Sequence, residues 1–186
     1  SNAFLPSYGM AECALAVSFA TVGGGVQIDS VDGDVLSDTA EARPYVEGSP
    51  TRRKDFVNCG PPLPGFTVEV RGEDGRVLPD RRVGRIHLHS PSVMNGYYNA
   101  PEYTAEVLSA DRWLNTGDLG YFADGVLYLT GRAKDLLIVN GRNIWPQDLE
   151  SLAEQQPEVR PTDASAFSVP GADGTEVAVL VVQVRE

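Results

Sequence analysis

The chain has 186 residues, of which 42% are hydrophobic, and a formal net charge of −11. This length accommodates one domain, or one domain and part of another, and the apolar content is sufficient for a folded core. The negative charge disfavours wrapping of nucleic acid, which needs clustered Lys and Arg, and it also disfavours adhesion to an anionic membrane surface.

Both ends of the chain resemble cuts through a longer polypeptide. Residues 1–3 (SNA) have the sequence of a remnant from a cleaved affinity tag and are set aside. The chain then begins abruptly at Phe4 and ends two residues after the apolar run 177–184. The longest uncharged stretch, 13–28, is shorter than the roughly 20 residues that a membrane-spanning helix needs. The two cysteines fit no metal or redox spacing, which favours a reducing cytoplasm.

The segment 23–55 is rich in Asp, Ser and Gly and shows little periodicity. We therefore expect a long loop or insertion. Its acidic run lacks the spacing and the closing Glu of a calcium-binding loop. We expect these side chains to be solvated: Asp29, Asp32, Asp34 and Asp38.

Most of the remaining chain is expected to form strands joined by tight turns. Asp-Gly and Asn-Gly pairs tolerate the positive φ angles of a type I′ turn. Four such pairs stand between strand-like segments: Asp74-Gly75, Asp124-Gly125, Asn140-Gly141 and Asp173-Gly174. Two of these turns predict hairpins, one pairing 120–123 with 126–130 and the other pairing 136–139 with 142–145.

Two helices are predicted, each with a proline in its first turn. One begins at Pro101, with Glu102 and Glu106 near its positive end. The other begins at Pro146 and ends before Pro157.

Six short blocks follow one another along the chain. They are 8–12 (YGMAE), 91–99 (PSVMNGYYN), 113–115 (WLN), 116–118 (TGD), 131–135 (GRAKD) and 140–150 (NGRNIWPQDLE). Each block alone occurs often by chance. The ordered set, which spans Tyr8 to Glu150, closely resembles the distal core motifs of the adenylate-forming superfamily. That superfamily holds acyl-CoA synthetases, fatty acyl-AMP ligases and peptide-synthetase adenylation domains.

The resemblance implies an α+β fold. A strand-rich, distorted β-barrel subdomain is expected over residues 4–134, followed by a hinge and part of a small α+β C-terminal domain over 135–186. It also implies an AMP-forming ligase that activates a fatty acid with ATP and Mg²⁺. The superfamily's phosphate-binding loop and its acyl-contacting lysine have no counterpart in this chain. We therefore expect the isolated chain to be inactive.

The resemblance assigns the nucleotide-binding residues to the first and fourth blocks. Tyr8 would stack on the adenine, with Gly9 and Met10 beside it. Glu12 would bind Mg²⁺ through ATP. Asp118 would hold the ribose hydroxyls, whose protons need an acceptor.

The fifth block carries three further assignments by resemblance. Arg132 would contact the ribose or the phosphate edge during catalysis, and Lys134 and Asp135 would form the hinge about which the small domain rotates. Structural alternatives exist: Tyr8 as a core aromatic, Asp118 as a turn cap, and Arg132 and Lys134 as solvated charges beside a hairpin.

Three features favour the fatty acyl-AMP ligase branch. Ala11 stands where most members have threonine, a long gap separates Glu12 from Gly60, and 56–60 (FVNCG) resembles that branch. Its members pass the acyl group to an acyl carrier protein, and an insertion in this region packs against their small domain. The alternatives are a long-chain fatty acid–CoA ligase, with CoA as acceptor, and a non-catalytic nucleotide-binding module.

Overall fold

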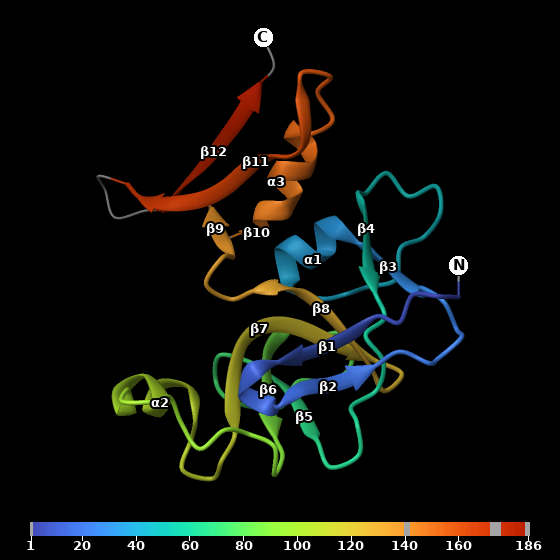
Figure 1. Cartoon of the computed structure of the whole chain (residues 1–186). Coiled ribbons are helices and arrows are strands. Elements are labelled where there is room, and N and C mark those ends of the chain that lie inside the picture. Colours follow the sequence, from blue (N-terminus) through green and yellow to red (C-terminus); the bar gives the residue numbers. More distant parts are fainter. Residues whose placement is uncertain (1, 140–141, 172–175, 185–186) are drawn as a thin grey trace. The chain divides into compact units, whose positions relative to one another are not determined.

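The computed structural model describes residues 2–139, 142–171 and 176–184. The chain forms two compact units, Ser1–Thr130 and Gly131–Glu186, and each is described by itself. The elements up to the boundary are β1 (Ser7–Met10), the 3₁₀ helix η1 (Ala11–Cys13), β2 (Leu15–Phe19), β3 (Ile28–Asp32), α1 (Gly33–Thr39), β4 (Arg53–Val57), β5 (Thr67–Arg71), β6 (Gly84–His89), α2 (Pro101–Val107), β7 (Leu114–Ala123) and β8 (Val126–Arg132), which crosses it (Figure 1). Those beyond it are β9 (Leu137–Val139), β10 (Arg142–Ile144), α3 (Pro146–Ala153), β11 (Val159–Pro170) and β12 (Glu176–Val184). The strand-rich α+β class is confirmed.

The main sheet of the first unit has the strand order β5-β6-β7-β8 (Figure 1). Side chains alternate along β6, where Ile86 and Leu88 are fully buried while Arg85 and His89 are exposed. Ile86 and Leu88 belong to one core cluster with Leu114 of β7. Burying each such side chain contributes about 1.5–3 kcal/mol, which fixes the face that the sheet turns toward the core.

The predicted hairpin at Asp124-Gly125 is confirmed. The two strands that it joins, β7 and β8, are neighbours in the sheet, and the turn residues have positive φ angles of 52° and 75°. Positive φ at both central residues is what a type I′ turn requires. Asp74-Gly75 lies in a second turn, which follows β5 and in which Gly75 has a φ of 77°.

The expected long loop over 23–55 is wrong for residues 28–39 and 53–55, which form strands and a helix. Strands β3 and β4 pair antiparallel, from Ile28 opposite Val57 to Asp32 opposite Arg53. A five-residue strand with a single fully buried side chain, Val31, gives too short an alternation to stand out in a polar sequence.

Helix α1 follows β3 directly, and its first turn explains why it forms. The Asp32 carboxylate accepts hydrogen bonds from the backbone N–H groups of Asp34 and Val35, at 3.1 Å each. This is N-capping, which satisfies donors that a helix otherwise leaves open. The bond from Val35 contributes most to lowering the pKa of Asp32. Leu36 then anchors the helix, because its side chain is fully buried.

The acidic run is likewise not uniformly solvated. Asp29 is half-buried and accepts hydrogen bonds from the side chains of Arg81 and Tyr121. Tyr121 lies on β7, so this contact fastens the β3–β4 pair to the main sheet.

The expected barrel is not closed among the described residues of the first unit. The β1–β2 and β3–β4 pairs are separate two-stranded sheets. Isolated bridges, Ser18 with Pro62 and Asn58 with Tyr128, connect neighbouring segments. Between β4 and β5 the chain contains three prolines, in the sequence 61–64 (PPLP). Proline has no backbone N–H, so a continuous ladder cannot run through this connection.

The second unit contains the other predicted hairpin, which is also confirmed. Strands β9 and β10 pair antiparallel, with Leu137 opposite Ile144. The expected turn residues Asn140-Gly141 lie outside the described residues, as does Asp173-Gly174, which precedes β12. Strands β11 and β12 pair with each other.

The two predicted helices are present, and both begin at the expected prolines. Helix α2 covers Pro101–Val107, and α3 covers Pro146–Ala153 and so ends four residues before Pro157. Helix α3 lies against β11 (Figure 1). Within the part of the chain that the structure describes, no helix is both long and apolar enough to cross a membrane.

Candidate functional site

Two of the candidate nucleotide-binding residues meet directly. The Tyr8 hydroxyl, on β1, donates a hydrogen bond of 2.7 Å to Oδ2 of Asp118, on β7, although 110 positions separate them in sequence. Asp118 is nearly buried, with 9% of its surface exposed. The first and fourth motif blocks therefore converge on one place in the first unit.

The geometry of β7 explains how Asp118 is oriented. The register between β6 and β7 shifts between Arg85 and His87, which marks a bulge opposite the Thr116–Asp118 segment. The Thr116 hydroxyl accepts from the backbone N–H of Asp118 at 3.1 Å and donates to the carbonyl of Ile86 at 3.0 Å. Bulges re-aim side chains that a regular strand would place elsewhere.

The environment keeps the Tyr8 hydroxyl protonated. Burial raises the pKa of Tyr8 well above its ordinary value, and the hydrogen bond and charge of Asp118 raise it further. A protonated phenol can donate to a carboxylate, whereas a phenolate cannot. A carboxylate has about four lone-pair sites, so a carboxylate that accepts from Tyr8 has the capacity for further donors.

Gly9 and Met10 occupy the same strand and contribute to its packing. A Cβ atom at Gly9 would lie 1.6 Å from the carbonyl oxygen of Leu15, so only glycine permits the observed approach of β1 to β2. Met10 packs against the core cluster of the unit. Both residues therefore fix the strand that carries Tyr8.

Glu12 lies in η1, immediately after β1. Its Oε1 accepts a hydrogen bond of 2.9 Å from the hydroxyl of Tyr97, and its backbone carbonyl accepts one of 2.8 Å from the N–H of Met94. Carboxylate oxygen is a ligand that Mg²⁺ prefers, and Mg²⁺ is usually bound by one or two carboxylates with substrate phosphates and water. A single carboxylate fits that mode of binding. The described residues contain no group of three or more His, Cys, Asp or Glu placed to hold a metal ion by themselves.

The candidate residues of the fifth block belong to the second unit. Arg132 ends β8, and its carbonyl accepts a hydrogen bond of 3.2 Å from the backbone N–H of Asp135. Tyr8, Glu12 and Asp118 thus lie in the first unit, and Arg132, Lys134 and Asp135 lie in the second.

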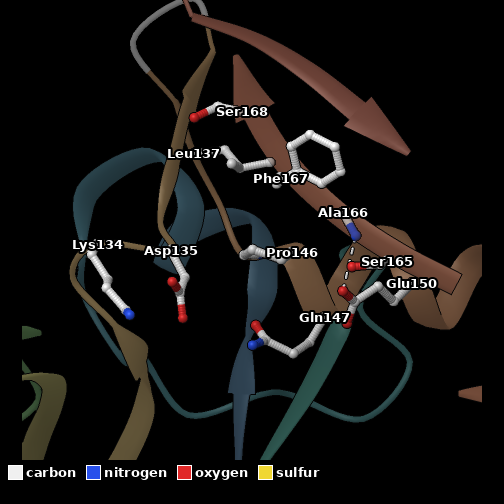
Figure 2. Close-up of a pocket in the computed structure, with 10 residues that line it drawn as sticks. All are labelled: Lys134, Asp135, Leu137, Pro146, Gln147, Glu150, Ser165, Ala166, Phe167 and Ser168. Atoms are coloured by element: carbon white, nitrogen blue, oxygen red, sulfur yellow. Dashed lines mark hydrogen bonds between the residues drawn. The ribbon is translucent and has the colours of Figure 1, made fainter. Parts of the chain in front are cut away.

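Lys134 and Asp135 line a pocket of about 330 Å³ in this second unit (Figure 2). Its other lining residues come from β9, α3 and β11: Leu137, Pro146, Gln147, Glu150, Ser165, Ala166, Phe167 and Ser168. Glu150 Oε1 accepts from the backbone N–H of Ala166 at 2.9 Å, which holds α3 against β11. The expected hinge residues thus sit at a polar pocket rather than within a packed core.

Two sets of side-chain contacts in the first unit were not predicted from the sequence. Tyr97 stands inside the second block, which resembles the superfamily as a whole, but nothing local in the sequence indicates that its hydroxyl reaches Glu12. Asp29, Arg81 and Tyr121 lie in three separate segments, so no spacing signal connects them.

Residues 2–98 match the family of AMP-binding enzymes, and the chain belongs to that family of adenylate-forming ligases. Among its relatives, a putative acyl-CoA synthetase of Caulobacter vibrioides is 52% identical over 97% of this chain and 32% of the relative. The long-chain-fatty-acid–AMP ligase FadD26 of Mycobacterium tuberculosis is 35% identical over 99% of the chain and 32% of the relative.

The structure is also similar to a solved one from a study of fatty acyl-adenylate ligases of E. coli and L. pneumophila. The two share 46% sequence identity with a TM-score of 0.87, over 100% of this chain and 32% of the solved chain. The chain therefore spans about a third of the length of the proteins that it resembles.

Proposed function

We propose that this chain contributes part of the nucleotide site of a ligase that activates a fatty acid with ATP, forms acyl-AMP and passes the acyl group to an acyl carrier protein. The observation that carries the proposal is the hydrogen bond between Tyr8 and Asp118. It joins two motifs that the family resemblance assigns to the adenine and the ribose.

The chemistry of the reaction explains what these residues must do. A carboxylate is a poor electrophile, because its negative charge repels nucleophiles and oxide is a poor leaving group. Attack of the carboxylate on the α-phosphorus of ATP forms a mixed anhydride and releases pyrophosphate. The enzyme must hold the nucleotide and neutralise phosphate charge while this happens.

Three residues of the first unit have a proposed task in that scheme. Tyr8 presents its ring to the adenine while its hydroxyl stays on Asp118, and Asp118 accepts from the ribose hydroxyls. Glu12 contributes a carboxylate ligand to Mg²⁺, which when bound offsets phosphate charge. Arg132, in the second unit, contacts the ribose or the phosphate edge, and Lys134 and Asp135 form the hinge of the small domain.

A second candidate function is transfer of the acyl group to CoA. The name of the Caulobacter relative favours it, because that relative is 52% identical to this chain whereas FadD26 is 35% identical. The structural similarity to a protein from a study of fatty acyl-adenylate ligases favours the acyl-AMP assignment instead.

The test uses the full-length enzyme with ATP, Mg²⁺, fatty acid and CoA, and resolves acyl-AMP from acyl-CoA by chromatography. Accumulation of acyl-AMP with little acyl-CoA is the expected result. Efficient acyl-CoA formation would replace the proposal with the second candidate, and absence of both products would favour a non-catalytic nucleotide-binding module.

We further propose that the isolated chain does not turn over, since it supplies only part of the site. Its pyrophosphate release with ATP and fatty acid should stay at background, and a robust signal from pure protein would contradict this. We place the enzyme in the cytoplasm, because Cys13 and Cys59 are both free thiols and disulfides are rare in that compartment.

A further inference from the structure

We propose that Tyr97 is a positioning residue that orients the carboxylate of Glu12 toward the metal–nucleotide complex. This inference rests on the proposed function of Glu12. It starts from the 2.9 Å hydrogen bond that the Tyr97 hydroxyl donates to Glu12 Oε1 across 85 sequence positions.

A hydrogen bond to one carboxylate oxygen fixes the rotation of the whole group. It leaves the second oxygen, Oε2, with a defined direction. Residues that hold a metal ligand in this way typically change metal affinity by about 10- to 100-fold when they are removed. Tyr97 can act in this manner because a phenol hydroxyl donates a hydrogen bond and a carboxylate oxygen accepts one.

The backbone of the loop that carries Tyr97 is also attached to η1, the helix that carries Glu12. The N–H of Met94 donates to the carbonyl of Glu12 at 2.8 Å, so the loop that carries Tyr97 is bonded to η1 at a second point. Val93, directly before it, is buried in the core with 3% exposure. The loop therefore cannot move away from Glu12 without breaking core packing.

Arg112 clamps the same loop from its other side. Its Nη2 donates to the carbonyls of Val93 and Met94, at 2.7 and 3.3 Å, and its Nη1 donates to Oδ1 of Asn95 at 3.3 Å. A planar guanidinium with several donors suits this task, because its donors have fixed relative directions.

Helix α2 holds Tyr97 itself. The backbone N–H of Tyr97 donates to the hydroxyl of Thr104 at 2.9 Å, and that hydroxyl donates in turn to the carbonyl of Ala100 at 2.9 Å. Gly96 has a φ of +149°, and a Cβ atom there would lie 2.9 Å from Cγ2 of Thr104. The tyrosine is thus placed by its own chain and by a helix, and not only by its contact with Glu12.

The experiment measures binding rather than turnover, in the full-length enzyme without fatty acid, so that no acyl-AMP forms. Mn²⁺ replaces Mg²⁺, and its binding with ATP is followed by electron paramagnetic resonance. Tyr97→Phe removes the hydroxyl and keeps the ring, and we expect it to weaken Mn²⁺·ATP binding roughly tenfold. Binding of ATP in the presence of EDTA, measured by titration calorimetry, should change less than twofold.

The neighbouring Tyr98→Phe is the matched control, because Tyr98 is 92% exposed, and it should leave both affinities unchanged. Thr104→Val, which removes the anchor of the Tyr97 backbone, should weaken Mn²⁺·ATP binding in the same direction. The double variant Glu12→Gln/Tyr97→Phe should bind no more weakly than Glu12→Gln alone, because Tyr97 acts through Glu12.

Three results would overturn the inference. If Glu12→Gln weakens Mn²⁺·ATP binding but Tyr97→Phe and Thr104→Val do not, Tyr97 has no positioning role while the proposed role of Glu12 stands. If Glu12→Gln itself has no effect, the role of Glu12 fails and that of Tyr97 fails with it. Equal weakening of ATP binding with and without metal would likewise show a purely structural role.

Discussion

The hydroxyl of Tyr121 donates a hydrogen bond of 2.6 Å to Oδ2 of Asp29, which lies 92 positions earlier in the chain. The same oxygen accepts from Nη1 of Arg81 at 3.0 Å. Tyr121 is fully buried and stacks on Tyr128 at a ring-centroid distance of 5.1 Å. This contact attaches the β3–β4 segment to β7, the strand that also carries Asp118.

The first prediction concerns the stability of that attachment. Asp29→Ala leaves a buried tyrosine hydroxyl and a half-buried guanidinium without their shared acceptor, and we expect a loss of about 2–3 kcal/mol of unfolding free energy. Urea unfolding followed by the fluorescence of Trp113, in a Trp145→Phe background, reports on the first unit. Glu73→Ala, at an exposed acidic position, is the control; an equal effect of both variants would contradict the role of Asp29.

A second prediction follows from the buried tyrosines. Burial raises the pKa of both Tyr8 and Tyr121 above the ordinary tyrosine value, and their aspartate partners raise it further. Above pH of about 10 the unfolded chain releases these protons while the folded chain keeps them, so stability falls as pH rises. Each tyrosine adds a slope of about −1.4 kcal/mol per pH unit in that range.

Unfolding free energies at several pH values between 8 and 11 measure this slope, with the same Trp113 signal. Tyr121→Phe removes one titrating proton, so the pH slope of the unfolding free energy should become less steep by roughly 1.4 kcal/mol per pH unit. Phe56→Leu, which alters a ring that packs edge-on against Tyr121 without removing a titrating group, should leave the slope unchanged. An unchanged slope in Tyr121→Phe would show that Tyr121 titrates normally.

The third prediction concerns Asp118 in the full-length enzyme. Asp118→Ala removes the proposed acceptor of the ribose hydroxyls, at about 1.5–3 kcal/mol for bonds to a charged group. The kcat/KM for ATP should fall by roughly ten- to a hundredfold. Asp118→Asn keeps one acceptor oxygen and should lose less. Tyr8→Phe separates the contribution of the tyrosine bond, and wild-type ATP kinetics in Asp118→Ala would place the ribose contact elsewhere.

The fourth prediction tests the proposed hinge at Asp135. Proline at position 135 fixes φ and removes the N–H that donates to the carbonyl of Arg132. In the full-length enzyme, Asp135→Pro should leave adenylate formation partly intact while transfer to the acceptor fails. Asp135→Ala, which keeps the N–H and a free φ, should retain both steps. Equal loss of both half-reactions in Asp135→Pro would indicate misfolding or a different pivot.

The fifth prediction addresses the segment between β3 and β4. Asp32 and Arg53 face each other at the end of that ladder, so residues 33–52 can be replaced by Asn-Gly with the hairpin retained. If this segment favours the adenylating arrangement, the full-length variant should gain acyl-CoA formation. A few kcal/mol of differential stabilisation would suffice for such a shift.

Chromatographic separation of acyl-AMP and acyl-CoA gives the readout, and Glu73→Ala again serves as a control outside the segment. A variant that forms acyl-AMP at the wild-type rate and still makes no acyl-CoA would show that the segment is not the gate.

Several features of this protein follow from local sequence alone. The turn at Asp124-Gly125 needs only residues that accept positive φ, and the starts of α2 and α3 need only the fixed φ of proline. The order of the motif blocks indicates the family. Each block is a short run of neighbouring residues, so the blocks can be recognised without knowing the fold. None of these features depends on where a distant segment lies.

The long-range pairs within the first unit were decided by tertiary structure. Tyr8 meets Asp118, Glu12 meets Tyr97 and Asp29 meets Tyr121 across 110, 85 and 92 positions. The contacts of Asp118 and Tyr121 depend on the register of their strands, since a shift of one residue turns a side chain to the opposite face, and Asp118 lies at the bulge in β7. The contact of Glu12 depends on the path of the loop that carries Tyr97. A hydrogen bond also requires its atoms to lie within a few tenths of an ångström of one distance. Residue identity and spacing do not contain that information, so only the folded chain determines which side chains become partners.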